Sequence, residues 1–146
     1  MTAPSMSEHD LNDAKESLNR LQEVMKESNI PTIIVEYNGS YGKGEIESAL
    51  RKCDDSDRMY EEIPFYSSPL YLRLWNEIEN ATFSVLTYKH LGWDYDEGSR
   101  GRIMFKLNES GEMSIRIVHH WNDTSEDYEV EDISEYTNNE DSTFSL

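Results

Sequence analysis

The densest group of residues that could do chemistry is a run of acids and aromatics at the C-terminal end. Residues 122–146 hold nine Asp or Glu and no Lys or Arg. A row of carboxylates can imitate nucleic-acid phosphates, and a groove built from Lys and Arg would accept it. A solvated tail that aids solubility, or a strand or short helix within the fold, are the alternatives. The side chains predicted to bind a partner are Asp123, Glu126, Asp127, Tyr128, Glu129, Glu131, Asp132, Glu135 and Tyr136.

A second group, His119 and His120 with Asp94 or Asp96, has residue types that bind metals. Zinc sites usually need four ligands at motif spacing, and the single cysteine, Cys53, is distant in sequence. Neighbouring residues on a strand point to opposite faces, so the two imidazoles would not readily share one ion. We therefore predict no metal, no cofactor and no enzymatic activity. A metal-dependent enzyme built on these residues is the least favoured alternative.

The net charge restricts the class of partner. The 146 residues carry 30 acidic and 13 basic side chains, for a formal charge of −17. Such a surface repels nucleic-acid phosphates and anionic membranes, and it is attracted to basic protein surfaces. No apolar run is long enough to cross a bilayer. A single cysteine excludes an intrachain disulfide and fits a reducing compartment, so we expect a cytoplasmic protein.

The elements that must position these residues follow from periodicity and turn signals. Strands are β-branched or alternate apolar with polar residues, whereas helices repeat apolar residues every three or four positions. The pattern predicts an α+β fold with the order α-β-(β)-α-β-β, in which two helices pack a small antiparallel sheet of three to four strands. We expect one domain over 1–121 and an acidic C-terminal segment over 122–146. The predicted elements are helices over 8–28 and 68–91, and strands over 32–37, 45–50, 102–107 and 113–118, with an irregular connection over 54–69 and a loop over 92–101.

The first predicted helix has a narrow apolar stripe. Leu11, Ala14, Leu18, Leu21 and Met25 follow one another at spacings of three and four. Such a stripe packs either on the domain's own core or in a short coiled coil, and a homodimer stays open. We favour packing on the core. In the long loop, a structural turn that holds Trp93 in the core is favoured over a calcium site.

Two tracts carry a resemblance to a family. They are Tyr37-Asn-Gly-Ser-Tyr-Gly-Lys-Gly44-Glu-Ile-Glu47 and Gly92-Trp-Asp-Tyr-Asp-Glu-Gly98-Ser-Arg-Gly101. They resemble the Tyr-Asp-Gly-x-Gly-Asp-x-Gly-Gln-Ile-Glu and Gly-Trp-Glu-x-Asn-Asp-Gly-x-x-Gly tracts of an uncharacterised bacterial domain family that is often seen on plasmids and other mobile elements. The resemblance covers about residues 30–121 and differs at Lys43 and Tyr95. It implies the predicted order of elements and a bacterial or phage origin, and it implies no activity.

Together these features predict a non-catalytic, acidic protein-interaction factor. It would bind a basic surface of a nucleic-acid-handling protein and compete there with nucleic acid, as a counter-defence inhibitor of a phage or mobile element would. The alternative is an accessory or scaffold subunit of a bacterial complex that docks through its apolar helices.

Overall fold

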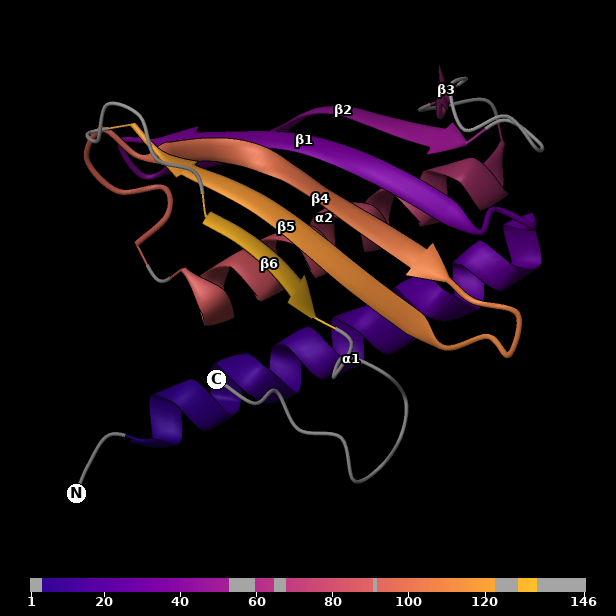
Figure 1. The fold of residues 1–146 in the computed structure, drawn as a ribbon, viewed down its shortest axis with the longest axis horizontal. Helices are drawn as coiled ribbons and strands as arrows, with labels where there is room; N and C mark the ends of the chain where they lie inside the picture. The colour runs from indigo at the N-terminus through magenta and orange to yellow at the C-terminus, as the bar shows by residue number, and fades with distance from the viewer. Residues whose placement is uncertain (1–3, 53–59, 65–67, 91, 123–128, 134–146) are drawn as a thin grey trace.

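The computed structural model describes residues 4–52, 60–64, 68–90, 92–122 and 129–133. In these ranges the chain forms two helices and six strands (Figure 1). The helices are α1 (Pro4–Ser28) and α2 (Pro69–Lys89). The strands are β1 (Thr32–Ser40), β2 (Lys43–Lys52), β3 (Tyr60–Glu62), β4 (Ser99–Leu107), β5 (Met113–Trp121) and β6 (Glu129–Ile133).

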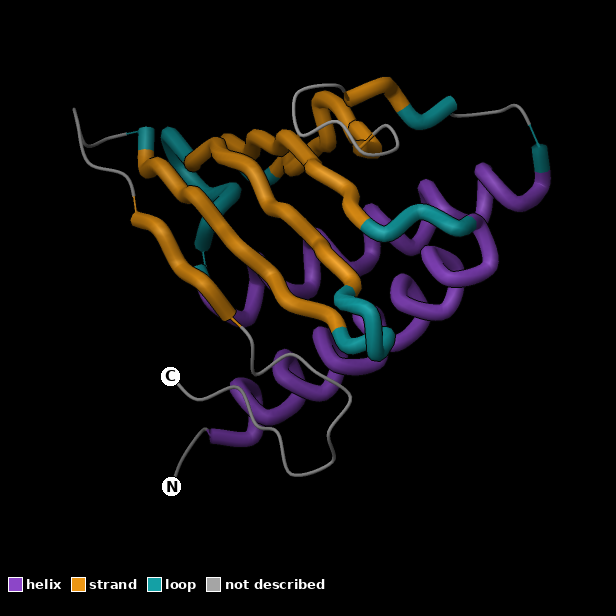
Figure 2. Tube along the Cα trace, turned by 45° about the vertical axis from the view of Figure 1, so that its right-hand side comes forward, coloured by secondary structure: helices purple, strands orange, loops and turns teal. Residues whose placement is uncertain are grey.

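All six strands belong to one antiparallel sheet with the order β3-β2-β1-β4-β5-β6. Both helices lie on the same side of this sheet, which is clear when the molecule is turned (Figure 2). The α+β class is confirmed, but the predicted three to four strands are too few. The three-residue β3 is too short to show an alternation. In β6, three of the five residues are acidic, so the sequence has no clear strand pattern. The strand nevertheless pairs with β5 along its whole length.

The stripe on α1 packs inside the fold, as predicted. Ala14, Leu18, Leu21 and Met25 are buried, and Leu11 is partly buried against the same core. The helix begins four residues earlier than the predicted residue 8. This face therefore packs on the chain's own core.

Helix α2 closes the core beside α1. Ser68 is its N-cap, with a side-chain oxygen that accepts a hydrogen bond from the Tyr71 amide, and Pro69 occupies the first turn. The apolar residues of α2 lie mainly on a buried face and on a half-buried flank beside it. The buried residues are Leu74, Ile78, Ala81, Thr82, Val85 and Leu86. None of the helices in the described ranges is long and apolar enough to span a membrane.

The central hairpin is longer than predicted. Strand β4 begins at Ser99 rather than Arg102, and β5 continues to Trp121 rather than Val118. Residues 99–101 belong to the predicted glycine-containing loop over 92–101, yet they pair with β1 on one side and with residues 119–121 of β5 on the other. At the turn, the Asn108 side-chain oxygen accepts hydrogen bonds from the amides of Ser110 and Glu112.

Candidate functional site

The two glycine-containing tracts form a single joint around Trp93. Gly39 and Gly44 are paired between β1 and β2, and the buried indole of Trp93 lies against both. A Cβ on Gly39 would lie 2.6 Å from the indole Cζ3, and a Cβ on Gly44 would lie 2.8 Å from Cζ2 and still closer to Cη2. The glycines are therefore required by the close approach of the ring. The prediction that a turn holds Trp93 in the core is confirmed.

Backbone hydrogen bonds complete this joint. The amide of Tyr41 donates to the Asp96 carbonyl at 2.9 Å, and that of Gly42 donates to the Asp94 carbonyl at 2.8 Å. Gly98 has a φ of +74°, and a Cβ there would overlap the carbonyl oxygen of Gly39. The backbone carbonyls that a calcium loop would offer to an ion are thus used, at Asp94 and Asp96, to hold the β1–β2 turn.

A group of histidines and aromatics lies next to this joint under the sheet. The hydroxyl of Tyr37 and Nδ1 of His119 are 2.5 Å apart, and both side chains are fully buried. The His119 ring stacks on that of His90, with centroids 4.0 Å apart and an angle of 6° between the planes. Trp121 meets His119 edge-on at 4.8 Å. The phenol and the imidazoles are types used in acid–base catalysis, but here they are enclosed in the core.

The residue that permits this contact is Gly101. Its Cβ would lie 2.6 Å from the Tyr37 hydroxyl, so the phenol can pass across β4 to reach β5 only because position 101 has no side chain. The same residue pairs with Tyr37 on one side and His119 on the other. The second tract thus positions both Trp93 and Tyr37.

The two histidines of the metal hypothesis do not act together. His119 is opposite Gly101 in the register and His120 is opposite Arg100, so the two side chains leave the strand on opposite faces. In the ranges that the structure describes, no three His, Cys, Asp or Glu side chains gather into a potential metal site. Cys53 lies outside the described residues.

The predicted partner-binding residues fall into two groups. Glu129, Glu131 and Asp132 lie on β6, the outermost strand, opposite His119, Ile117 and Arg116 of β5 in the register. The structure therefore brings these three together on one edge of the sheet. The remaining predicted residues lie outside the described residues, namely Asp123, Glu126, Asp127, Tyr128, Glu135 and Tyr136.

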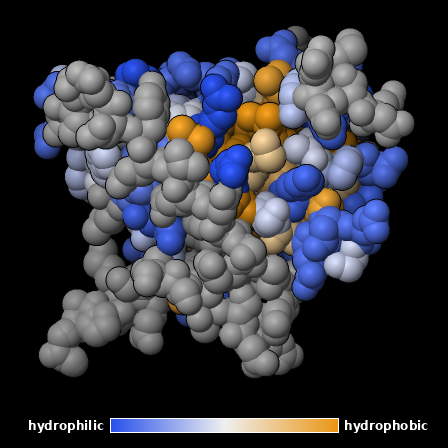
Figure 3. Space-filling model, in the orientation of Figure 1, coloured by the Kyte–Doolittle hydropathy of each residue, from blue (hydrophilic) through white to orange (hydrophobic). Residues whose placement is uncertain are grey.

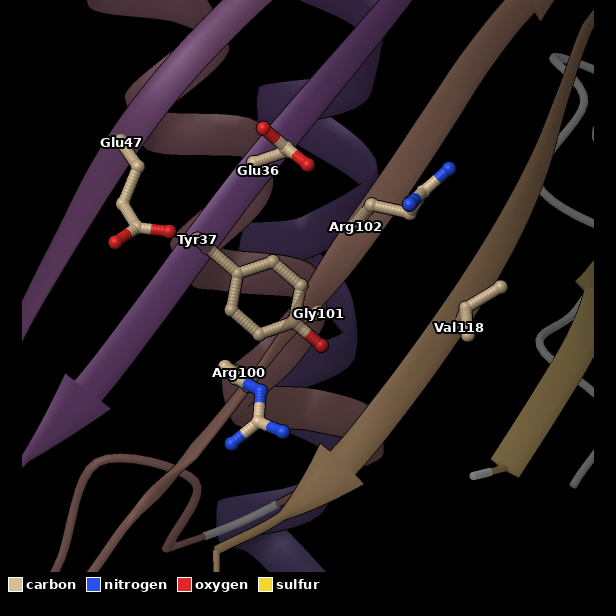
Figure 4. Close-up of a pocket in the computed structure, with 7 residues that line it drawn as sticks. All are labelled: Glu36, Tyr37, Glu47, Arg100, Gly101, Arg102 and Val118. Carbon is tan, nitrogen blue, oxygen red and sulfur yellow. The ribbon is translucent and has the colours of Figure 1, made fainter. Parts of the chain in front are cut away.

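A hollow on the other side of the sheet, away from the helices, was not predicted. Its volume is about 400 Å³, and it is lined by two carboxylates, two guanidinium groups, one valine and a floor formed by Tyr37 and Gly101 (Figure 4). The charged residues alternate along their strands with buried or half-buried residues, and this alternation is the sequence signal that could have identified them. They are Glu36 and Glu47 on β1 and β2, and Arg100 and Arg102 on β4.

Few of these charges neutralise one another. Glu36 accepts a hydrogen bond from the Ser48 hydroxyl at 3.0 Å, and Arg100 donates to the Asn122 side chain at 3.0 Å. Glu47 and Arg102 make no ion pair with any residue that the structure describes. One half-buried carboxylate, one exposed carboxylate and two exposed guanidinium groups in one hollow suit a partner surface that carries both signs of charge.

The ion pairs that the structure does form lie elsewhere and join elements of the scaffold. Arg73 of α2 binds Glu27 of α1 through two hydrogen bonds, one of 2.5 Å, and the hydrogen bond from Arg73 holds the pKa of the Glu27 carboxyl below its usual value. On the sheet, Arg51 of β2 donates to Glu61 of β3, and this contact raises the pKa of Arg51.

A comparison with known protein families identifies the family to which this chain belongs. A model described as a family of unknown function, DUF6878, matches residues 13–132. The chain belongs to this family. The DUF6878 match begins within α1 and ends within β6, so it includes most of α1, all of α2, strands β1 to β5, most of β6 and the joint around Trp93. No curated protein and no solved structure matches the chain.

Proposed function

We propose that this DUF6878 protein is a non-catalytic binding protein whose acidic C-terminal part docks on a basic surface of a nucleic-acid-handling protein and competes there with nucleic acid. The observation that supports the proposal most directly is the position of β6. It sets Glu129, Glu131 and Asp132 on the outermost strand of the sheet. Acidic residues on a strand that is paired in a sheet imitate a phosphate backbone better than those on a free segment, because less backbone conformational entropy is lost on binding.

The position of these acids at an edge also supports this use. An edge strand offers unpaired backbone groups to other sheets, and charged residues on it oppose such pairing. Three acids in the five residues of β6 therefore favour recognition by charge over the addition of another strand. The cytoplasm of a bacterium, and a gene on a phage or plasmid that opposes a host defence system, are the setting we propose.

The experiment is capture of host proteins by the full-length chain, followed by displacement with duplex DNA at two salt concentrations. We expect captured proteins to bind nucleic acid themselves and to be released by DNA, with weaker capture at the higher salt. Capture that is indifferent to both DNA and salt would exclude competition with nucleic acid.

Two matched variants test the role of β6. Glu129→Gln/Glu131→Gln/Asp132→Asn removes three charges from the proposed surface. At about 0.5–1 kcal/mol for each partly solvated contact, the loss is about 2 kcal/mol, or roughly 30-fold in affinity. The control, Glu16→Gln/Glu23→Gln/Glu79→Gln, makes the same change of charge at exposed positions of the helices and should bind like the original chain. Equal losses in both variants would mean that only net charge matters.

A further inference from the structure

In the described ranges of the chain, no helix or strand covers the face of the sheet opposite the helices. Among the described residues, both helices lie on the other face (Figures 1 and 2). At its centre, Leu50 of β2, Ile34 of β1 and Met104 of β4 are paired in one row across three strands. All three are only half-buried, and Figure 3 shows apolar surface among hydrophilic side chains on this side. An apolar row at the middle of a sheet face is suited to contact with another protein.

The charges around this row are divided between the two halves of the face. The half formed by β1 and β2 carries acids, and the two lysines of β2 lie only at its ends. The half formed by β4 and β5 carries bases. The acidic residues are Glu36, Glu45 and Glu47, and the basic residues are Arg100, Arg102, Lys106 and Arg116.

We propose that this face binds a second copy of the chain, with the two sheets packed face to face about a two-fold axis. The axis would run parallel to the strands and pass between β1 and β4, which are the two central strands. Such an axis lays β1 of one copy over β4 of the other, and β2 over β5. The acidic half of each copy then faces the basic half of its partner, so the surface is complementary to itself.

The cross-strand register makes this match specific to individual residues. Glu36 and Arg102 are directly opposite each other in the β1–β4 pair, at equal distances from the axis. The rotation exchanges their positions, so Glu36 of each copy faces Arg102 of the other. Ile34 and Met104 are related in the same way and would be in apolar contact. Each contact occurs twice. Neither Glu36 nor Arg102 forms an ion pair with any residue that the structure describes, and Glu36 accepts one hydrogen bond, from the Ser48 hydroxyl.

The size of the face sets the strength of the dimer. Four strands at about 4.8 Å spacing and about eight residues of length give roughly 500 Å² for each copy. Sheets that pack face to face lie about 10 Å apart, close enough for these side chains to meet. A total of about 1,000 Å² is at the lower limit of specific interfaces, so we expect a dissociation constant in the micromolar range.

The test is charge exchange, with the full-length chain in sedimentation equilibrium at about 0.15 M salt from about 1 to 300 µM. The original chain should pass from one to two times its 17.1 kDa mass as concentration rises. Glu36→Arg and Arg102→Glu should each raise the dissociation constant by at least about 100-fold, because each places like charges in both symmetric contacts. An equimolar mixture of the two variants should dimerise again, since both contacts of the mixed pair then join opposite charges.

The mixture separates an effect between copies from an effect within one. Each variant also places like charges side by side in its own sheet, and mixing cannot relieve that strain unless the copies touch. Circular dichroism checks that each variant folds. If a reversed charge prevents folding, the neutral variants Glu36→Gln and Arg102→Gln replace the charge-reversed ones. Glu79→Arg, an equal reversal on α2, should dimerise like the original chain. A monomer at all concentrations, or a mixture of variants that stays monomeric, would overturn the proposal. The acids of β6 are untouched in every variant, so the result is separate from the test of partner binding.

Discussion

Replacing Gly44 by alanine tests the joint between the two tracts. The new Cβ would lie 2.8 Å from Cζ2 of Trp93 and closer to Cη2, whereas carbon atoms pack at about 3.5–4.0 Å. The indole would therefore have to move by about 1 Å. It is held on its other side by Phe83, stacked at 5.5 Å, and edge-on by Tyr37 at 5.8 Å. Because these rings leave it little freedom, the clash is not relieved by a rotation of Trp93 alone.

We expect Gly44→Ala to lower the free energy of unfolding by about 2–3 kcal/mol, as overpacking of a buried site does. For a chain of this length that is a fall of roughly 5–10 °C in the midpoint of thermal unfolding. Backbone strain does not contribute, since Gly44 is not among the glycines with positive φ. Urea and thermal unfolding followed by circular dichroism measure the effect.

The same substitution in a Trp93→Phe background separates the clash from other causes. Phenylalanine lacks the outer ring atoms that meet position 44, so the clash disappears. Alanine is favoured over glycine in a strand by about 0.5–1 kcal/mol, and Gly44→Ala should then be neutral or stabilising. The coupling between the two substitutions should be about 2–3 kcal/mol. If Gly44→Ala costs the same in both backgrounds, Trp93 does not rest on Gly44 and the reasoning is wrong.

Three further predictions concern the scaffold. Tyr37→Phe removes the hydrogen bond to the buried Nδ1 of His119 and should lower the free energy of unfolding by about 1–2 kcal/mol in urea titrations. Ser68→Ala removes the N-cap of α2 and should cost about 1 kcal/mol, whereas Ser68→Asp should keep the stability. Arg73→Gln should raise the pKa of Glu27 toward 4.5, as measured by NMR titration of its carboxyl, because the hydrogen bonds that lower it are lost. A carboxyl whose pKa is lowered by folding stabilises the folded state at pH values above its unfolded-state pKa. This contribution is lost as the pH falls through its folded-state pKa. The free energy of unfolding of Arg73→Gln should therefore depend less on pH in this acidic range than that of the original chain.

Each of these predictions has a result that would contradict it. An unchanged stability for Tyr37→Phe would mean that the phenol and imidazole contribute no net hydrogen bond. If Ser68→Asp falls as far as Ser68→Ala, the loss is not one of capping. A Glu27 titration that Arg73→Gln leaves in place would show that the ion pair does not persist in solution.

The elements with strong local patterns were predictable. The α1 stripe and the two strands that flank Asn108 were predicted from spacing and residue types alone, because such signals depend on neighbours in sequence. Strands β3 and β6 were missed or left open, since pairing with an existing sheet overrides their weak patterns.

The candidate sites were less predictable for a related reason. The two tracts are about fifty residues apart in sequence, and nothing within either one indicates that Trp93 of the second rests on Gly39 and Gly44 of the first. Similarly, Glu36 and Arg102 become neighbours only through the β1–β4 register. Local propensity cannot supply a register between distant strands, because it is set by how the whole sheet packs on its helices.

The order of the strands also separates pairs that are close in sequence from one pair that is distant in sequence. Strands β1, β2 and β3 are neighbours in sequence, as are β4, β5 and β6, so each half assembles through short connections. Among the strands that the structure describes, β1 and β4 are the pair that joins the two halves of the sheet, and their nearest partners, Gly39 and Ser99, are 99 − 39 = 60 residues apart. Closing a loop of that length costs roughly 3–4 kcal/mol of chain entropy before any contact forms. The rate of folding should therefore be governed by the meeting of β1 with β4, and substitutions there should slow folding more than equally destabilising ones in the outer strands.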